Sequence, residues 1–312
     1  MSFAVELEQV SKRFGKQLAV DRLDLRVPTG SIYGFIGPNG SGKTTTLRMI
    51  LRILQADQGV IRVLGRSVGQ ATDDRVGYLP EERGLYKRMR VIDLLTYFAH
   101  LKGLRDCDAA VQFWLNKLYA AEWSKKRVDM LSKGMSQKIQ FITAVVANPQ
   151  LVILDEPFSG LDPVNMNVIR DAIVDLRAQG TTVIFSTHDM GVAERMCDTI
   201  FMIFRGKKVL DGTLEAIQQR YPANRIRVAF DQPQDEFPAL SAVSDVERVG
   251  RFFELAVAPA SSPQDVLARL IAERSVTHFE VIRPSLHDIF VHIAQPEGDR
   301  APPDSVPTSS LA

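Results

Sequence analysis

The sequence has little cysteine and no long apolar run. Only Cys107 and Cys197 occur in 312 residues, and their spacing matches no zinc or redox motif. Their scarcity argues against a disulfide scaffold and favours a reducing compartment. The longest apolar runs, such as Thr199–Phe204, are far shorter than the ~20 residues that span a bilayer. Glu6 and Glu8 interrupt the N-terminus where a secretory signal needs an apolar stretch, so we expect a chain that does not cross a membrane by itself.

The chain also lacks an excess of charge of either sign. Lys plus Arg number 38 and Asp plus Glu number 37, which gives a formal net charge of +1. This balance provides no electrostatic footprint for nucleic acid or for an anionic membrane, so we expect no nucleic-acid partner. The hydrophobic share of 45% and the charged share of 24% are typical of a globular protein. A chain of this length has room for two domains.

Apolar, strand-like runs alternate with helical patterns through residues 1–220. This alternation is typical of an α/β domain with a largely parallel sheet that is covered on both faces. Buried strands are predicted at residues 31–36, 151–154 and 182–185. The first of these is followed by a Gly-rich turn, and from Thr44 onward a helix is predicted by apolar residues at helical spacing: Leu47, Ile50, Leu51 and Leu54.

Three further regions differ from this core. Between residues 81 and 148 the pattern turns helical, which predicts a helical subdomain inserted into the α/β domain. Residues 221–294 predict a small C-terminal α+β domain, with strands at 226–230 and 252–257 and helices at 263–273 and 285–294. Residues 295–312 carry many prolines and almost no large apolar side chains, so we expect a disordered tail.

The strongest functional signal is a phosphate-binding loop of the form G-x-x-x-x-G-K-[ST], placed between a predicted strand and a predicted helix. Its backbone N–H groups can surround phosphates while the N-terminus of the helix faces them. Lys43 is expected to reach the β- and γ-phosphates, and the Thr44 hydroxyl to bind Mg²⁺. The pattern predicts a P-loop NTPase. The residues of the loop are Gly37, Pro38, Asn39, Gly40, Ser41, Gly42, Lys43 and Thr44.

Two adjacent carboxylates follow the apolar strand at residues 151–154. The C-terminal ends of buried parallel strands present functional groups beside such a phosphate loop. Asp155 is therefore expected to hold Mg²⁺, directly or through water, and Glu156 to polarise an attacking water as general base. Adjacent acids also occur in ordinary solvated turns, so the phosphate loop is what favours the catalytic interpretation.

In the order and spacing of its motifs, the chain resembles the ATP-binding cassette (ABC) ATPases over residues 4–219. Residues 131–135, Leu-Ser-Lys-Gly-Met, look like the signature loop of that family, and residues 159–162, Ser-Gly-Leu-Asp, look like its D-loop. His188 matches the switch histidine, and Phe14 lies where these cassettes stack an aromatic ring on adenine. Each match also has an ordinary interpretation: Ser132 suits a helix N-cap, His188 a packed strand end, and Phe14 the core of a hairpin.

The resemblance implies ATP as the substrate, Mg²⁺ as the metal, and a role for each matched residue. The implied catalytic residues are Lys43, Glu156 and His188, the last holding the γ-phosphate and the attacking water. The implied Mg²⁺ ligands are Thr44, Asp155 and Glu81. The implied nucleotide-binding residues are Phe14, the loop from Gly37 to Thr44, Thr45, Ser132, Lys133, Gly134 and Asp162.

Two positions depart from the usual family pattern. Glu81 stands where a glutamine is common, and a carboxylate can bind Mg²⁺ but cannot donate a hydrogen bond to the γ-phosphate. We therefore predict that Glu81 couples the nucleotide state to the partner subunit mainly through the metal. The signature loop carries Lys133 and Met135 where glycine and glutamine are usual.

These variants resemble the prokaryotic subgroup whose partners are ABC-2-type export permeases and which includes the sodium-efflux ATPases. Residues 283–290 likewise resemble the end of the accessory domain that this subgroup carries. The resemblance implies a peripheral location at the cytoplasmic face of the cell membrane, with a permease contacting residues 81–86. It also implies a head-to-tail homodimer, or a dimer with a paralogue, because one phosphate loop and one signature loop cannot complete the site alone.

Two alternatives belong to other functional classes. A soluble mechanical ATPase that acts on ribosomes or DNA is disfavoured because the chain has one phosphate loop and no heptads between residues 44 and 131. A catalytically silent regulator is disfavoured because Lys43, Asp155, Glu156 and His188 are all present. The C-terminal domain shows no ligand constellation, so we interpret it as a packing or dimer-stabilising module.

Overall fold

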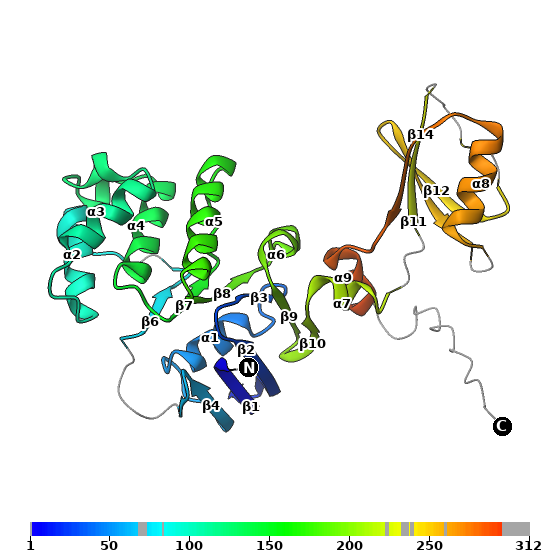
Figure 1. Cartoon of the computed structure of the whole chain (residues 1–312). Helices are drawn as coiled ribbons and strands as arrows, with labels where there is room; N and C mark the ends of the chain where they lie inside the picture. The colour runs from blue at the N-terminus through cyan, green and yellow to red at the C-terminus, as the bar shows by residue number, and fades with distance from the viewer. Residues whose placement is uncertain are drawn as a thin grey trace. The chain divides into compact units, whose positions relative to one another are not determined.

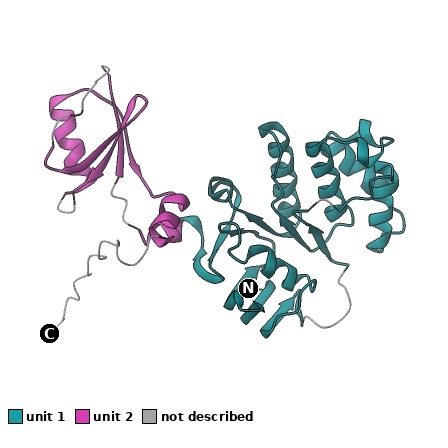
Figure 2. Cartoon of the chain, turned by 180° about the vertical axis from the view of Figure 1, so that it is seen from behind, with its two compact units in different colours: residues 1–214 teal, residues 215–312 magenta. Residues whose placement is uncertain are grey.

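The computed structural model describes residues 2–67, 74–82, 84–221, 225–231, 237, 240–258 and 261–294. The chain divides into two compact units, Met1–Leu214 and Glu215–Ala312 (Figure 2). The predicted tail, residues 295–312, lies outside the described residues. No helix in the described part of the chain has the length and apolarity needed to cross a bilayer.

The first unit is built around a six-stranded sheet with the strand order β10-β9-β3-β8-β7-β6. All its neighbouring strands run parallel except β10, which pairs antiparallel with β9. Every residue of β3, β7 and β8 is buried, as expected for strands that are covered on both faces. These strands confirm the buried strands predicted at residues 31–36, 151–154 and 182–185. The strands are β3 (Ile32–Ile36), β6 (Val76–Leu79), β7 (Leu151–Asp155), β8 (Thr182–Thr187), β9 (Thr199–Phe204) and β10 (Lys207–Gly212).

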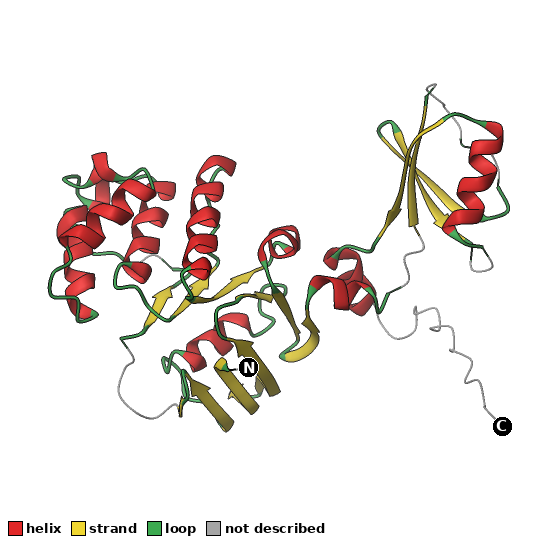
Figure 3. Ribbon diagram, viewed as in Figure 1, coloured by secondary structure: helices red, strands yellow, loops and turns green. Residues whose placement is uncertain are grey.

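An antiparallel sheet, which the sequence analysis did not predict, covers one face of this central sheet. Its strand order is β2-β1-β4-β5, and it packs together with helix α1 (Figure 3). Alternate residues of β7 face opposite layers: Leu151 and Ile153 join this cluster, whereas Val152 and Leu154 join the cluster of the helical layer. The strands are β1 (Phe3–Phe14), β2 (Gln17–Pro28), β4 (Gln58–Val63) and β5 (Arg66–Ser67).

Helix α1 (Lys43–Ile50) follows the phosphate loop as predicted, but it ends before Leu54. The chain reverses at Arg52, whose φ of +61° is left-handed. The amide of Ile53 then donates to the carbonyl of Arg48 over 2.8 Å. Helices commonly end with a left-handed residue followed by an amide that donates back to the last turn. The helix predicted from the apolar spacing, which included Leu54, was therefore about one turn too long.

The expected helical subdomain lies on the other face of the central sheet (Figure 1). It comprises α2 (Val91–Leu101), α3 (Asp108–Lys117), α4 (Lys133–Val145) and the 3₁₀ turns at Ala121–Trp123 and Val128–Met130. Trp114 of α3 and Phe141 of α4 meet edge to face, with their ring centroids 6.1 Å apart. Helices α5 (Pro163–Ala178) and α6 (Met190–Met196) complete the unit.

The second unit has its own four-stranded antiparallel sheet with the order β12-β13-β11-β14. Strands β11 (Arg225–Phe230) and β13 (Phe252–Val257) and helices α8 (Pro263–Glu273) and α9 (Leu286–Ala294) match the predicted segments, whereas β12 (Val243–Val249) and β14 (Val276–Ile282) were missed. Helix α7 (Leu214–Gln218) belongs largely to this unit, and its Gln218 donates to the carbonyl of Pro284 over 2.9 Å. The domain boundary at residue 220 stays a prediction.

Candidate functional site

The phosphate loop connects the end of β3 to the start of α1. Gly42 is the residue before the helix and has φ of +111°, a left-handed conformation that side chains rarely adopt. A Cβ at this position would also lie 2.7 Å from the carbonyl oxygen of Ala19. The glycine is therefore required both by its backbone conformation and by the close approach of β2.

Lys43 is folded back over the loop that precedes it. Its side chain is 6% exposed, and Nζ donates to the carbonyl oxygens of Gly37 over 2.7 Å and Pro38 over 3.2 Å. Burial lowers the pKa of Lys43 below its usual value, although the nearby carboxylates of Glu156 and Asp155 act in the opposite direction. The ammonium group is thus held by neutral carbonyls at the position where phosphates are expected.

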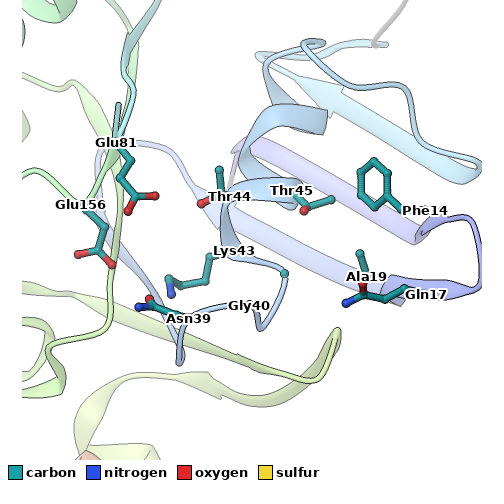
Figure 4. Close-up of a pocket in the computed structure, with 11 residues that line it drawn as sticks. Phe14, Gln17, Ala19, Asn39, Gly40, Lys43, Thr44, Thr45, Glu81 and Glu156 are labelled. Atoms are coloured by element: carbon teal, nitrogen blue, oxygen red, sulfur yellow. The ribbon is translucent and has the colours of Figure 1, made fainter. Parts of the chain in front are cut away.

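A cleft of about 420 Å³ opens beside the loop (Figure 4). In Figure 4, Lys43 lies between the loop and two carboxylates, Glu81 and Glu156, while Phe14 lies at the opposite end of the cleft. Phe14 is 47% exposed, so its ring is available to a ligand rather than packed in a core. The lining residues are Phe14, Gln17, Ala19, Asn39, Gly40, Gly42, Lys43, Thr44, Thr45, Glu81 and Glu156.

Asp155 ends β7 as a fully buried carboxylate. One of its oxygens, Oδ1, accepts hydrogen bonds from Ser186 Oγ and, over 3.5 Å, from Thr44 Oγ1. The other oxygen, Oδ2, is buried with no partner among the described residues. A buried acceptor without a donor is costly, and Mg²⁺ prefers oxygen ligands such as this carboxylate and the Thr44 hydroxyl. The residues therefore fit a magnesium ion.

Glu156 adopts an unusual backbone conformation with φ of +51°. Its amide donates to Ser186 Oγ over 3.1 Å and to the Ser186 carbonyl over 3.2 Å, and these contacts hold the turn. The carboxylate is turned toward His188, whose Nδ1 lies 2.9 Å from Glu156 Oε1. His188 is therefore not packed away at the strand end, since its side chain is 61% exposed.

Ser186 was not singled out from the sequence, yet it contacts both carboxylate residues. It is fully buried on β8, and the strand register places it beside Asp155. A hydroxyl directly after the apolar residues 183–185 and two residues before His188 is the signal that was available. Gln17 and Ala19 of the cleft were also missed, because they come from an antiparallel sheet that was not predicted.

The structure places the signature-like residues apart from this cleft. Among the described residues, those that line the cleft do not include Ser132, Lys133, Gly134 or Asp162. Ser132 is the N-cap of α4 and accepts from the Met135 amide over 3.3 Å, so the capping interpretation is correct for this structure.

The signature-like loop contacts the D-loop-like segment of the same chain. Gly160 has φ of +71°, and a Cβ there would lie 2.4 Å from Lys133 Cε. Asp162 caps α5 by accepting from the Asn165 amide over 2.9 Å, and this hydrogen bond lowers the pKa of its carboxyl group. The phosphate loop of this chain therefore faces its own carboxylates, but not its own signature loop.

Comparison with known proteins agrees with this geometry. Residues 20–159 match the family described as "ABC transporter", and residues 212–294 match the "ATP-binding protein DrrA1-3-like, C-terminal domain". A solved structure described as "Structure of ATP binding subunit of ABC transporter" is 27% identical, with a TM-score of 0.66. The likeness covers 70% of this chain and 93% of that one.

Curated relatives extend the similarity over nearly the whole chain. The "Uncharacterized ABC transporter ATP-binding protein YhaQ" of Bacillus subtilis is 39% identical over 91% of this chain and 96% of its own length. The "Nod factor export ATP-binding protein I" of Sinorhizobium fredii is 30% identical over 93% of this chain and 85% of its own length. The chain therefore belongs to the ATP-binding proteins of ABC transporters, a family of ATPases.

Proposed function

We propose that this ATPase powers an ABC-2-type export permease from the cytoplasmic face of a membrane. Export is supported by the relatedness to the Nod factor export ATP-binding proteins and by the DrrA-like C-terminal domain. The proposed permease contact is the aromatic surface of Tyr86 and Tyr97. Their rings meet edge to face at 5.8 Å, and the two residues are 53% and 42% exposed. This surface follows the Glu81 segment directly in the chain.

The proposed chemistry assigns one task to each residue of the cleft. Glu156 takes a proton from the attacking water as general base, and His188, which is hydrogen-bonded to it, orients the carboxylate and the γ-phosphate. Lys43 exchanges its carbonyl partners for the β- and γ-phosphates. Phe14 stacks on the adenine ring.

Magnesium is proposed to be held by Thr44, Asp155 and Glu81, three side chains with oxygen donors. The observation that supports this set most directly is the buried Oδ2 of Asp155, which has no hydrogen-bond partner among the described residues. When bound, the ion neutralises charge on the phosphate oxygens. Because Glu81 carries a carboxylate instead of an amide, it cannot donate a hydrogen bond to the γ-phosphate and is assigned to the metal.

Dimerisation is proposed because the cleft of one chain lacks the signature loop. Ser132 and Gly134 lie outside the lining of the cleft that contains Lys43 and Glu156. In the proposed head-to-tail dimer, the γ-phosphate joins the phosphate loop of one copy to Ser132, Lys133 and Gly134 of the other. Asp162 communicates between the two sites. Hydrolysis removes this bridge and lets the dimer open.

A trapped dimer tests this proposal. Glu156→Gln keeps the shape of the side chain but removes the general base, so ATP should stay bound and the two copies should stay together. Light scattering after gel filtration is expected to show a dimer with ATP and Mg²⁺ and a monomer without nucleotide. Adding Gly134→Asp should restore the monomer without preventing ATP binding, since Gly134 lies outside the cleft. A Glu156→Gln chain that stays monomeric at saturating ATP and high protein concentration contradicts the proposal.

A further inference from the structure

Gln140 of helix α4 makes two hydrogen bonds that bracket one residue of the nucleotide cleft. Its side-chain amide, Nε2, donates to the carbonyl oxygen of Pro80 over 3.1 Å and to that of Glu82 over 3.2 Å. The residues that carry these two carbonyls precede and follow Glu81 in the chain, and the side chain of Glu81 lines the cleft (Figure 4). Gln140 itself is 3% exposed and does not line the cleft.

The chemistry of the amide suits this arrangement. A glutamine NH₂ group has two N–H donors, and here each one meets a different carbonyl. Gln140 Oε1 is buried without a partner in the described part of the chain, so the two donated bonds alone set the orientation of the amide. The reverse orientation would put its oxygen against two carbonyl oxygens. Neither glutamate nor methionine, which are similar in length, could donate both bonds.

The contact links the segment around Glu81 to the helix that begins at the signature-like loop. Residues 80–82 are where the chain leaves β6 of the central sheet and enters the helical subdomain. Helix α4 begins at the signature-like loop with Ser132 as its N-cap, and Gln140 lies two turns further along the same helix. An α-helix of this length moves as one body, so a contact at Gln140 relates the position of Glu81 to that of the signature loop.

We propose that Gln140 is a positioning residue for Glu81. Its amide ties the carbonyls of Pro80 and Glu82, the residues on either side of Glu81, to helix α4 and thereby sets where the Glu81 carboxylate lies in the cleft. Metal and catalytic groups must be held within about 0.5 Å of their productive positions, and a free loop does not provide this. The inference rests on the proposed role of Glu81 in magnesium binding, and it adds the residue that places that ligand relative to the signature helix.

The first measurement addresses the contact itself. Gln140→Met keeps the length and burial of the side chain but removes both donors. In the full-length chain, hydrogen–deuterium exchange of the peptide that covers residues 79–86 should become about 10-fold faster or more, since local opening is no longer opposed by two buried bonds. Thr143→Val is the matched control. It removes a buried hydroxyl bond to the Gln140 carbonyl on the same helix, and it should leave exchange in this peptide unchanged.

The second measurement addresses function through the magnesium dependence of ATP hydrolysis. Loss of a residue that orients a metal ligand typically costs about 10-fold or more in metal affinity, so Gln140→Met should raise the Mg²⁺ concentration for half-maximal activity by that factor. In a Glu81→Ala background the same change should have an effect of less than about two-fold, because no side-chain oxygen is left at position 81 through which Gln140 could act.

The outcomes separate this inference from the proposed role of Glu81. If Glu81→Ala has the wild-type magnesium dependence, the metal role of Glu81 is wrong, and the exchange measurement alone decides whether Gln140 holds the segment. If Glu81→Ala shifts the dependence but Gln140→Met does not, the positioning role is overturned. Equal acceleration of exchange by Gln140→Met and Thr143→Val also overturns it, because the cause would then be general loosening of α4.

Discussion

At the scale of single residues, the site depends on the buried hydroxyl of Ser186, which forms hydrogen bonds with Asp155 and Glu156. Ser186 donates to the Asp155 carboxylate and accepts from the Glu156 amide. The first bond orients a carboxylate that we assign to magnesium, and the second supports the left-handed backbone of the proposed general base. Backbone conformations of this kind persist only where surrounding contacts hold them.

Ser186→Ala should therefore impair catalysis more than stability. We expect hydrolysis to fall by about 10-fold or more, while the free energy of unfolding falls by about 1–3 kcal/mol. Steady-state kinetics and chemical denaturation measure the two effects. Ser31→Ala is the matched control, because it removes another buried serine hydroxyl bond, to the Pro28 carbonyl, away from the cleft. Equal losses of activity in both variants would count against a special role for Ser186.

The buried Lys43 predicts a pH dependence of nucleotide binding. Burial lowers its pKa below the usual 10.5 in the free chain, and the negative phosphates of a bound nucleotide favour the ammonium form and raise the pKa again. Binding should therefore take up protons at alkaline pH, and affinity should fall as the pH rises through the lowered pKa. Calorimetric titration in buffers of different ionisation enthalpy measures this uptake.

The control for this titration is Lys43→Arg, which stays charged over the same range. Its nucleotide affinity should not fall as the pH rises toward 10.5. If the wild-type chain instead releases protons when it binds nucleotide, the bound phosphates do not favour the ammonium form of Lys43, and the prediction is wrong.

At the scale of helices and strands, the helical subdomain is joined to the core by a close contact between β6 and α4. Gly77 of β6 faces the Ala144 carbonyl of α4, and a Cβ at Gly77 would lie 2.0 Å from that oxygen. The conflict is steric, since the backbone of Gly77 is not left-handed. The close approach brings α4 near enough for Gln140 to reach the chain after β6.

Gly77→Ala should force these two elements apart. We expect a loss of about 1–3 kcal/mol in the free energy of unfolding, with a fall of about 2–4 °C in Tm for each kcal/mol. Because the shift also moves α4, the Mg²⁺ requirement for hydrolysis should rise as it does in Gln140→Met. Gly84→Ala makes a suitable comparison, since a Cβ there meets no atom within 4 Å and should leave Tm unchanged.

Some strands could be predicted from their own residues, whereas others depend on the strand with which they pair. Strands β3, β7 and β8 were found because every residue in them is buried, so each contains a short run of apolar residues. Strand β12 was missed because it is almost wholly exposed at the edge of its sheet and shows no apolar alternation. Its pairing with β13, for example Glu247 opposite Glu254, is decided by the neighbouring strand.

At the scale of the whole molecule, the chain consists of two units with separate cores. The core of the C-terminal unit lies between α8 and one face of its sheet, with Val228, Leu255 and Leu270 among the buried residues. Among the described residues, those that line the cleft proposed to bind nucleotide all belong to the first unit. The two units are therefore expected to unfold as separate cooperative transitions.

Leu255→Ala tests this separation. Truncating a fully buried leucine should destabilise the C-terminal unit by about 2–5 kcal/mol, and differential scanning calorimetry should show only its transition moving to lower temperature. Affinity for ATP should be unchanged. Leu95→Ala, a buried leucine on α2 in the first unit, should lower the other transition instead. A single transition that moves as one in both variants would mean that the units unfold together.

The sequence alone determined which short contiguous segments were proposed for the site. The phosphate loop and the Asp155–Glu156 pair could be proposed because each consists of adjacent residues that follow an apolar strand. The tertiary structure alone decided which distant residues contact the site. It places Ser186 beside Asp155 and Gln140 against the segment around Glu81, and it leaves the signature-like loop outside the lining of the cleft. These contacts join residues 31 to 60 positions apart, and they depend on strand register and on the rotation of a helix, which no local pattern specifies.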